Sequence, residues 1–352
     1  MSIPIPNGYN TQRNLTHVLP SLAATLGAPT SNPLDLPQAS SAILLMIDGL
    51  GREQLEQYSA HAPFFRRVMQ HQTSAQTEMS SVYPSTTAAA LSSLGTALSP
   101  GEHGLVGYDV YDPDRQVVIN QLGGWDERTD PEVWQPAPTI FEQLNDQRQA
   151  GVHNIRPVTV SLPAFEDSAL TRASLQGPKF VGADELGERF VRAAQAAQQP
   201  GALIYLYVNE LDKAGHQHGP GSNTWLEVLE DLDAHARRMI RKLPGSTLVA
   251  VTGDHGMIEV KEEHRVDFSQ YGELIEHIAH TAGEPRMVQL HFDPAATEVQ
   301  REETRNAWVR RFGDQAWVVT RQQAIDAGWF GAVSPRVQQR IGDLLVTGFE
   351  PV

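Results

Sequence analysis

The sequence predicts an α/β protein built on a mostly parallel sheet with helices on both faces. Three short and continuous apolar runs indicate buried strands: SAILLMI (41–47), ALIYLYV (202–208) and TLVAV (247–251). Such runs are typical of parallel strands that are covered on both faces. A helical stretch precedes the second run (183–199) and another precedes the third (223–243). Because strands that alternate with helices form parallel sheets, we expect the three strands to share one sheet.

After residue 258 the pattern changes. EPRMVQLHF (284–292) and QAWVVT (315–320) predict strands, and the polar segment 297–312 between them predicts a helix. RIGDLLVTGF (340–349) predicts a further strand. We therefore expect an α/β catalytic core at residues 1–257, a small α+β insertion at 258–339 and a returning core strand at 340–352.

The composition excludes several classes of function. The formal charge is −15 and the sequence has no cluster of Lys or Arg, so binding of a nucleic-acid polymer is not expected. The chain has no cysteine, so any metal must bind to histidine and carboxylate ligands. No stretch approaches the roughly 20 apolar residues of a membrane span, and the N-terminus lacks a basic region followed by an apolar one. We expect a cytoplasmic protein, and no sequence feature indicates an oligomeric state.

An aspartate follows each of the three buried strands. Asp48 lies in MIDGLG, Asp212 in VNELDKAGH and Asp254 in TGDHGM. In open α/β sheets, ligands bind at the carboxyl ends of the strands, so the three carboxylates should converge. A single aspartate after a strand is usually a turn residue, whereas three that converge indicate a metal site. His216 stands four residues after Asp212, and His255 directly follows Asp254. Such oxygen and nitrogen ligands suit Zn²⁺ or Mn²⁺ better than Ca²⁺.

The segment SVYPSTT (81–87) leads into a helix rich in Ala and Leu. A threonine at such a position has two interpretations. It can cap the N-terminus of the helix. Alternatively, its hydroxyl can be a nucleophile that a metal activates, at a helix end that attracts phosphate. The segment taken alone favours the cap.

Together, four segments resemble the alkaline phosphatase superfamily and, within it, the nucleotide pyrophosphatase/phosphodiesterase branch. They are MIDGLG, YPSTT with TALSPGEHGLVG, LDKAGHQHGPGS and TGDHGM, which occur in the order of the family within residues 41–258. Only the last two would be specific if found singly. The resemblance implies a doubly wound, alkaline phosphatase-like core. It also implies two divalent metal ions bridged by the substrate phosphate, zinc first and manganese as the alternative.

The resemblance also implies a ligand set. One ion would be held by Asp48, Asp254 and His255 together with the nucleophilic threonine. The other ion would be held by Asp212 and His216. Each of these five residues stands at the position that the motif of the family assigns to a ligand.

The nucleophile implied by the resemblance is Thr87. The family places its threonine three residues after a proline, and Thr87 stands three residues after Pro84, which selects it over Thr86. A phosphothreonine intermediate would form on its hydroxyl and then be hydrolysed. His218 has no counterpart among the ligands of the family, so we expect it to face solvent.

Two positions depart from the pattern of the family. Its phosphate-contacting asparagine corresponds here to Tyr108, whose hydroxyl would supply a single hydrogen bond to the substrate. The family completes its second metal site with a downstream histidine, and no histidine follows His291 in this sequence. We expect His264 to take that place. The alternatives are His277, His280, His291, a ligand beyond Val352, or a site that lacks its third ligand.

The function expected from the sequence is hydrolysis of a phosphodiester or phosphoanhydride bond in a small molecule, such as a nucleotide, with two metal ions. A phosphomonoesterase or phosphonate hydrolase on the same core is the alternative enzyme. Monoesterases usually supply an extra cation, and Lys213 would point away from the metals in an extended loop. A non-catalytic protein that binds metal or phosphate is a different class, and it fits a site that has lost a ligand.

Overall fold

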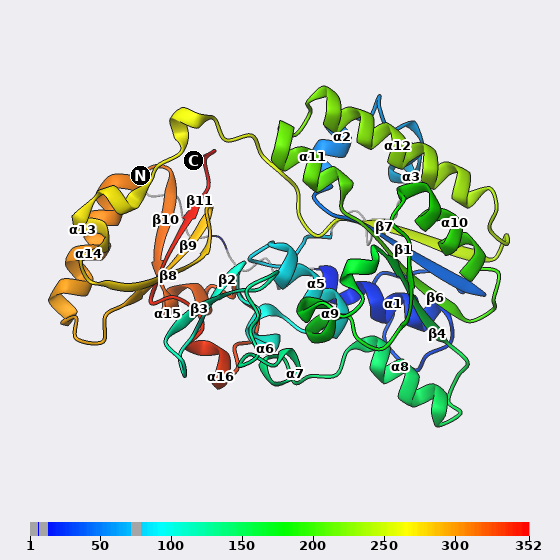
Figure 1. The fold of residues 1–352 in the computed structure, drawn as a ribbon, viewed down its shortest axis with the longest axis horizontal. Helices are drawn as coiled ribbons and strands as arrows, with labels where there is room; N and C mark the ends of the chain where they lie inside the picture. Colours follow the sequence, from blue (N-terminus) through cyan, green and yellow to red (C-terminus); the bar gives the residue numbers. More distant parts are fainter. Residues whose placement is uncertain (1–5, 7–12, 72–78, 352) are drawn as a thin grey trace.

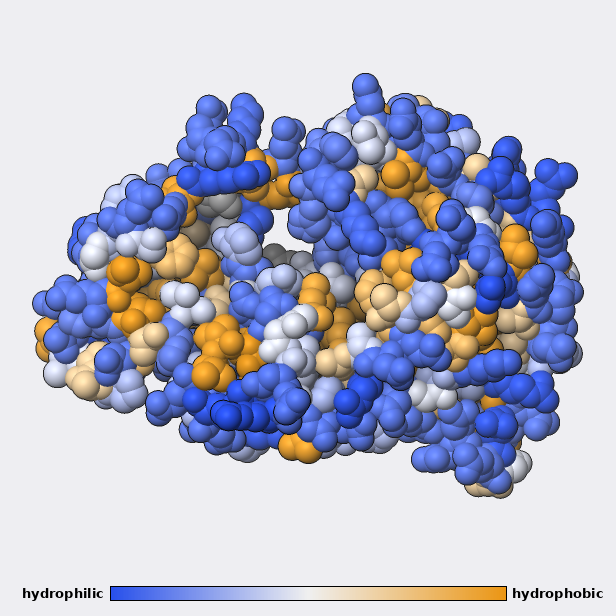
Figure 2. All heavy atoms as spheres, viewed as in Figure 1, coloured by the Kyte–Doolittle hydropathy of each residue, from blue (hydrophilic) through white to orange (hydrophobic). Residues whose placement is uncertain are grey.

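The computed structural model describes residue 6, residues 13–71 and residues 79–351. Two sheets form its framework, one in each of two lobes (Figure 1). The space-filling view shows a mostly hydrophilic surface and an opening between the lobes (Figure 2). Among the described residues, no helix is both long enough and apolar enough to cross a membrane.

The first sheet has five strands in the order β5-β4-β6-β1-β7, and every pairing is parallel. The three strands predicted from apolar runs are confirmed as β6, β1 and β7. The other two strands were not predicted, because neither forms a continuous apolar run: β4 begins with Arg-Pro and β5 has only four residues. The strands are β1 (Ser41–Ile47), β4 (Arg156–Ser161), β5 (Lys179–Gly182), β6 (Ala202–Val208) and β7 (Thr247–Thr252).

Helices cover both faces of this sheet, which confirms the predicted fold class. Successive side chains of a strand point to opposite faces, so Leu44 and Leu45 of the fully buried β1 enter different core clusters. The cluster with Leu44 includes residues of α1 (Val18–Thr25), α5 (Thr87–Thr96), α8 (Ile140–Gln149) and α9 (Ala169–Ser174). The cluster with Leu45 includes residues of α2 (Arg52–Gln57), α3 (Pro63–Gln70), α10 (Leu186–Ala196), α11 (Glu210–His218) and α12 (Asn223–Ile240).

The second sheet has six strands in the order β10-β11-β9-β8-β2-β3, and its pairings are antiparallel. One face packs against α13 (Gly272–Ile275) and α14 (Glu298–Phe312). Val319 and Leu345 on the other face belong to the same core cluster as Leu44 of β1, so the core is continuous between the sheets. The strands are β2 (Asp109–Asp112), β3 (Val117–Asn120), β8 (Ile278–Glu284), β9 (Met287–Phe292), β10 (Ala316–Thr320) and β11 (Leu344–Gly348).

Short helices connect these elements. They are α6 (Pro100–His103), α7 (Pro131–Trp134), α15 (Arg321–Asp326) and α16 (Pro335–Gln338), with 3-10 turns at Leu15–His17, Pro163–Phe165, Glu262–His264 and Phe268–Gln270.

The prediction of a returning core strand at residues 340–352 is wrong. The strand exists, but β11 pairs with β10 and β9 in the second sheet. An apolar segment predicts a buried strand, but it does not identify the sheet to which the strand belongs. Here both sheets have faces covered by helices or core residues, so either could have taken the strand. In addition, β2 and β3 belong to the second sheet, although they lie within residues 1–257, which were expected to form the α/β core.

Candidate metal centre

Two buried aspartates stand side by side at the carboxyl edge of the parallel sheet. Asp48 directly follows β1, and Asp254 comes two residues after the neighbouring strand β7. Their exposed fractions are 4% and 0%. Oδ1 of Asp48 and Oδ2 of Asp254 are buried without a hydrogen-bond partner among the described residues. Because a buried carboxylate oxygen without a partner is costly, this arrangement fits a bound cation.

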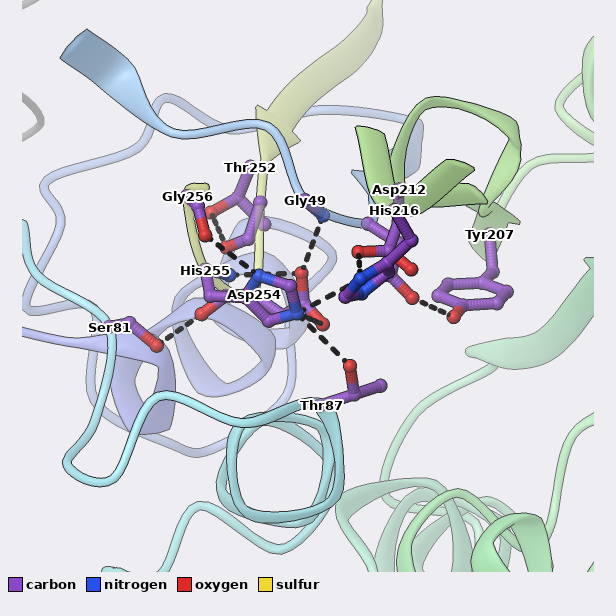
Figure 3. Close-up of polar contacts among 12 residues, drawn as sticks. Gly49, Ser81, Thr87, Tyr207, Asp212, His216, Thr252, Asp254, His255 and Gly256 are labelled. Atoms are coloured by element: carbon purple, nitrogen blue, oxygen red, sulfur yellow. Dashed lines mark hydrogen bonds and ion pairs between the residues drawn. The ribbon is translucent and has the colours of Figure 1, made fainter. Parts of the chain in front are cut away.

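His255 completes a three-residue group with these aspartates. Its Nε2 lies 3.4 Å from Oδ1 of Asp48 and 3.5 Å from Oδ2 of Asp254. Its Nδ1 lies 3.0 Å from the carbonyl oxygen of Gly256. Since a carbonyl only accepts hydrogen bonds, Nδ1 carries a proton, and Nε2 is the ring nitrogen that faces the carboxylates (Figure 3). The three residues each offer one ligand atom, and these atoms lie within 4.8 Å of one another.

The carboxylates are crowded enough to shift their pKa values. Burial, with the charges of Asp254 and Asp212, raises the pKa of Asp48 well above its usual value. Burial also raises the pKa of Asp212. Burial lowers the pKa of His255, but the charge of Asp254 and the hydrogen bond to the carbonyl of Gly256, with further nearby carboxylates, make the net shift upward. A divalent cation at this place would stabilise the charged forms of the aspartates.

Thr87 faces this group from the first position of α5. Its Oγ1 lies 3.2 Å from Nε2 of His255 (Figure 3). The N-cap of α5 is Thr86, whose side chain makes no capping hydrogen bond. The capping interpretation therefore does not describe Thr87, whose hydroxyl points into the cluster. The first N–H groups of a helix also lack intrahelical acceptors and favour an anion.

Asp212 and His216 form a second pair beside the first group. Both lie on α11, and the spacing of four residues places them on one face, with Oδ1 of Asp212 3.3 Å from Nε2 of His216. Asp212 was expected in a loop at the strand end, and the structure places it in the first helical turn instead. Gly49 has a φ of +74°, and a Cβ there would lie 3.1 Å from Asp212. The chain after Asp48 thus passes directly against Asp212.

A buried ion pair anchors the N-terminus of α11. The guanidinium of Arg189, which is fully buried on α10, pairs with the carboxylate of Glu210, the first residue of α11. Its Nη1 also lies 3.4 Å from the carbonyl oxygen of Tyr207 at the end of β6. These contacts fix the direction in which α11 leaves the sheet, and so the position of Asp212.

Tyr207 joins the candidate site, although no motif in the sequence marked it. It is buried on β6, and its hydroxyl donates a hydrogen bond to Oδ2 of Asp48. This contact leaves Oδ1 as the oxygen that faces the ligand group. The signal in the sequence was a tyrosine within an aliphatic strand, because a buried hydroxyl needs a partner.

Tyr108 lies on the second lobe, next to a residue that the sequence analysis did not consider. Its backbone N–H donates to Oε2 of Glu284, at the end of β8, over 3.2 Å. Tyr108 is 37% exposed. Burial raises the pKa of Glu284 to about 7, and the charge of His255 acts in the opposite direction. Glu284 therefore lies within electrostatic reach of His255 in the candidate metal site.

The structure does not bring His264 to Asp212 and His216. It ends an exposed 3-10 turn, where its Nδ1 lies 3.2 Å from the carbonyl oxygen of Pro351. His291 is buried on β9, with its ring 4.4 Å from that of Tyr111. Within the described part of the chain, no third histidine or carboxylate joins Asp212 and His216 at the spacing of the first group.

The fold and this group define an α/β protein with a candidate metal site beside a threonine at a helix N-terminus. The sequence model of the type I phosphodiesterase / nucleotide pyrophosphatase family matches residues 42–350. The chain therefore belongs to this family, which lies in the alkaline phosphatase superfamily and whose members are hydrolases acting on phosphoric esters. The resemblance seen in the sequence is confirmed.

Two curated relatives resemble this chain at low identity. The human ectonucleotide pyrophosphatase/phosphodiesterase family member 5 is 22% identical over 259 residues, which cover 71% of this chain and 51% of the relative. Rat family member 1 is 23% identical over 281 residues, which cover 75% of this chain and 28% of the relative. The chain thus spans about half of the human relative and about a quarter of the rat one.

Solved structures share the fold. Murine family member 5, an inactive threonine-to-alanine variant in complex with AMP, has a TM-score of 0.66 at 17% identity, covering 89% of this chain and 79% of that one. Phosphonoacetate hydrolase from Sinorhizobium meliloti 1021, in complex with phosphonoacetate, has a TM-score of 0.64 at 17% identity, covering 90% and 82%.

Proposed function

We propose that this protein hydrolyses a phosphodiester or phosphoanhydride bond in a small nucleotide-like molecule, with Thr87 as the nucleophile. One observation supports this most: Oγ1 of Thr87 lies 3.2 Å from Nε2 of His255, inside a group of buried carboxylates with unpartnered oxygens. A threonine hydroxyl is a weak nucleophile unless a base or a metal activates it. The ligand group beside Thr87 is suited to hold such a metal.

The donors divide into a group of three and a pair, and each would hold one divalent ion; the pair has no third protein ligand among the described residues. Asp48, Asp254 and His255 would hold one of them near Thr87, and Asp212 with His216 would hold the other. Carboxylate and imidazole ligands without thiolates suit Zn²⁺, with Mn²⁺ as the alternative. Two such ions supply Lewis-acid stabilisation of the attacking and leaving oxygens and neutralise the phosphoryl charge.

The residues of the chain have separate roles in this reaction. Oγ1 of Thr87 bonds to phosphorus while the bond to the leaving oxygen breaks, which gives a phosphothreonine and an alcohol or phosphate product. Water then hydrolyses the phosphothreonine and regenerates the hydroxyl. The N-terminus of α5 orients its free N–H groups toward the negative phosphoryl oxygens. Tyr207 holds Asp48 in the orientation in which Oδ1 faces the site.

Two features of the relatives support this assignment. The murine relative binds AMP, and its inactive form has alanine in place of a threonine. These facts belong to that protein. Because this chain matches about half of the human relative, we apply them here only as a proposal.

A phosphonate hydrolase is the second candidate, because phosphonoacetate hydrolase shares the fold. Enzymes that bind a terminal phosphoryl group use an additional cation, and Lys213 is the candidate. Neighbouring residues of a helix point about 100° apart, and Lys213 is exposed on α11 beside the inward-facing Asp212. This direction favours a diester over a phosphonate or monoester.

Metal content and a substrate panel test the proposal. We expect two zinc or manganese equivalents per chain, and faster hydrolysis of bis-p-nitrophenyl phosphate than of p-nitrophenyl phosphate or phosphonoacetate. One equivalent without turnover of any substrate would identify a non-catalytic metal binder. A preference for phosphonoacetate would identify the second candidate.

A further inference from the structure

A groove lies at the end of the parallel sheet opposite the metal centre. Its volume is about 750 Å³, and it runs along the edge strand β5 between α8 and α10. It is lined by the first residues of β4, β5 and β6, whereas the metal ligands follow the last residues of the parallel strands β1 and β7. The groove is therefore separate from the proposed active site.

All charged residues that line the groove are basic. They come from four different elements, although acidic residues outnumber basic ones by 42 to 27 in the whole chain. With this excess of acidic residues, a groove lined by chance would be expected to include carboxylates. The four are Arg148 on α8, Arg156 on β4, Lys179 on β5 and Arg192 on α10.

Most of this positive charge is not neutralised by the protein. Arg192 forms an ion pair with Glu188 at 2.6 Å. Among the described residues, no ion pair includes Arg148, Arg156 or Lys179. The groove thus has three uncompensated cations.

Protection of a sheet edge explains only part of this pattern. A lysine on an edge strand prevents pairing with another chain, which accounts for Lys179 on β5. It does not account for the two arginines, because Arg148 lies on a helix and Arg156 begins the inner strand β4.

The floor of the groove is apolar. A volume between about 300 and 1,000 Å³ is typical of sites for small organic molecules. Arginine binds phosphate in a planar, bidentate manner. The residues of the floor are Val158, Val181, Ala196 and Ala202, which belong to or pack against the core cluster on one face of the sheet.

We propose that this groove binds an organic phosphate monoester with an apolar body. The dianionic phosphate contacts Arg148, Arg156 and Lys179 at the rim, and the apolar body lies on the floor. The site contains no histidine or carboxylate, so binding needs no metal ion. This inference is independent of the proposed catalytic function.

Calorimetric titration of the full chain with hexyl phosphate tests the site. We expect saturable binding in the metal-loaded protein that persists after chelation, since phosphate held only at the metal centre would be released. Inorganic phosphate should bind the chelated protein at least 10-fold more weakly, because it has no apolar body. Absence of saturable binding after chelation would overturn the proposal.

Two double variants with the same change of charge distinguish the loss of cations in the groove from a general change in the charge of the protein. Arg156→Glu with Lys179→Glu should weaken binding of hexyl phosphate at least 10-fold. Arg66→Glu with Arg67→Glu, at exposed positions of α3, should leave binding unchanged. Equal weakening in both would overturn the proposal. Lys179→Gln, whose folding is checked by thermal melting, should give a smaller loss, and full affinity in a folded Arg156→Gln/Lys179→Gln protein would also contradict the site.

Discussion

Oγ1 of Thr87 and Nε2 of His255 lie 3.2 Å apart, although 168 residues separate them in the chain. The imidazole is fixed by the contact between its Nδ1 and the carbonyl of Gly256. The hydroxyl is fixed by the first turn of α5. This relationship joins the nucleophile of the proposed reaction to a ligand of the proposed metal, so a change in either residue should affect both chemistry and metal binding.

Thr87→Ala should abolish turnover of bis-p-nitrophenyl phosphate, with a loss of about 10³-fold or more, as is typical when a nucleophile is removed. Steady-state kinetics measure this loss, and Thr87→Ser should keep part of the activity because it keeps a hydroxyl. Thr86→Ala is the matched control, since the side chain of Thr86 makes no capping hydrogen bond. Equal losses in Thr86→Ala and Thr87→Ala would argue for a structural role of the segment.

His216→Ala should remove one of two metal equivalents, because His216 shares a helix face with Asp212. His218→Ala should keep both, since a residue two positions further along the helix points to another side. Metal analysis after dialysis distinguishes the two variants. Retention of both equivalents in His216→Ala would remove it from the ligand set. His264→Ala, in the same assay, tests the ligand that the sequence favoured.

Tyr207→Phe should weaken metal binding by about 10- to 100-fold, the usual cost of losing a residue that orients a metal ligand. The chain offers a close control in Tyr205, two residues earlier on β6. Its buried hydroxyl has no hydrogen-bond partner among the described residues. Tyr205→Phe should therefore leave metal affinity unchanged, as measured by competition with a chromogenic chelator. Similar affinities for both variants would contradict the positioning role of Tyr207.

Asp48→Asn should have opposite effects with and without metal. Burial and the nearby carboxylates raise the pKa of Asp48 above its usual value of 3.8. The folded state then holds the proton more tightly than the unfolded state, so the chelated wild type loses stability as the pH rises above about 4. At pH 8, chelated Asp48→Asn should melt a few degrees higher than the chelated wild type, and the gap should close toward pH 4. In the metal-loaded state the variant should melt lower.

Thermal melting of both forms between pH 4 and 8 checks this expectation. Asp184→Asn, which changes an exposed carboxylate, should show neither effect. A chelated Asp48→Asn protein that is less stable than the chelated wild type would mean that the aspartate is favourable without a cation.

Glu284→Gln should stabilise the protein above pH 7. Burial raises the pKa of Glu284 from 4.5 to about 7, so the wild type loses stability as the pH rises from 4.5 through 7. Glutamine keeps an oxygen for the N–H of Tyr108 and has no charge to bury. The gain should be about 1–3 kcal/mol at pH 8 and vanish near pH 4.5. Denaturant unfolding at both pH values measures it, with the exposed Glu303→Gln as the control; an equal gain at both pH values would contradict the ionisation argument.

The buried parallel strands could be predicted from the sequence because their apolar runs are continuous. SAILLMI and ALIYLYV are strands over all of their residues. In the second sheet, β9, β10 and β11 were also predicted from apolar segments, whereas β2, β3 and β8 were not. The segments DVYD and IAHTAGE mix polar and apolar residues, and long-range pairing rather than local apolarity makes them strands.

The site residues that could be predicted are those whose contacts follow from their place after a predicted strand. Asp48 and Asp254 follow adjacent parallel strands, so their proximity follows from the sheet. The position of Glu284 near the site depends on the pairing of β8 with β2 and on the contact between Glu284 and Tyr108. No local sequence pattern predicts that long-range pairing. Similarly, the sequence does not show that Tyr207 rather than Tyr205 contacts Asp48, because both hydroxyls belong to one apolar strand.

The core that continues from β1 through Val319 and Leu345 makes the two lobes one cooperative unit. A hinge that closed them on a substrate would have to break this packing, at a cost of about 1.5–3 kcal/mol for each large apolar side chain exposed. The distance from the metal centre to Tyr108 and Glu284 should therefore be the same before and after binding. The candidate metal centre and the surface around Tyr108 and Glu284 would then stay at a fixed spacing. We expect this protein to select substrates by whether their length matches that spacing, more than by their flexibility.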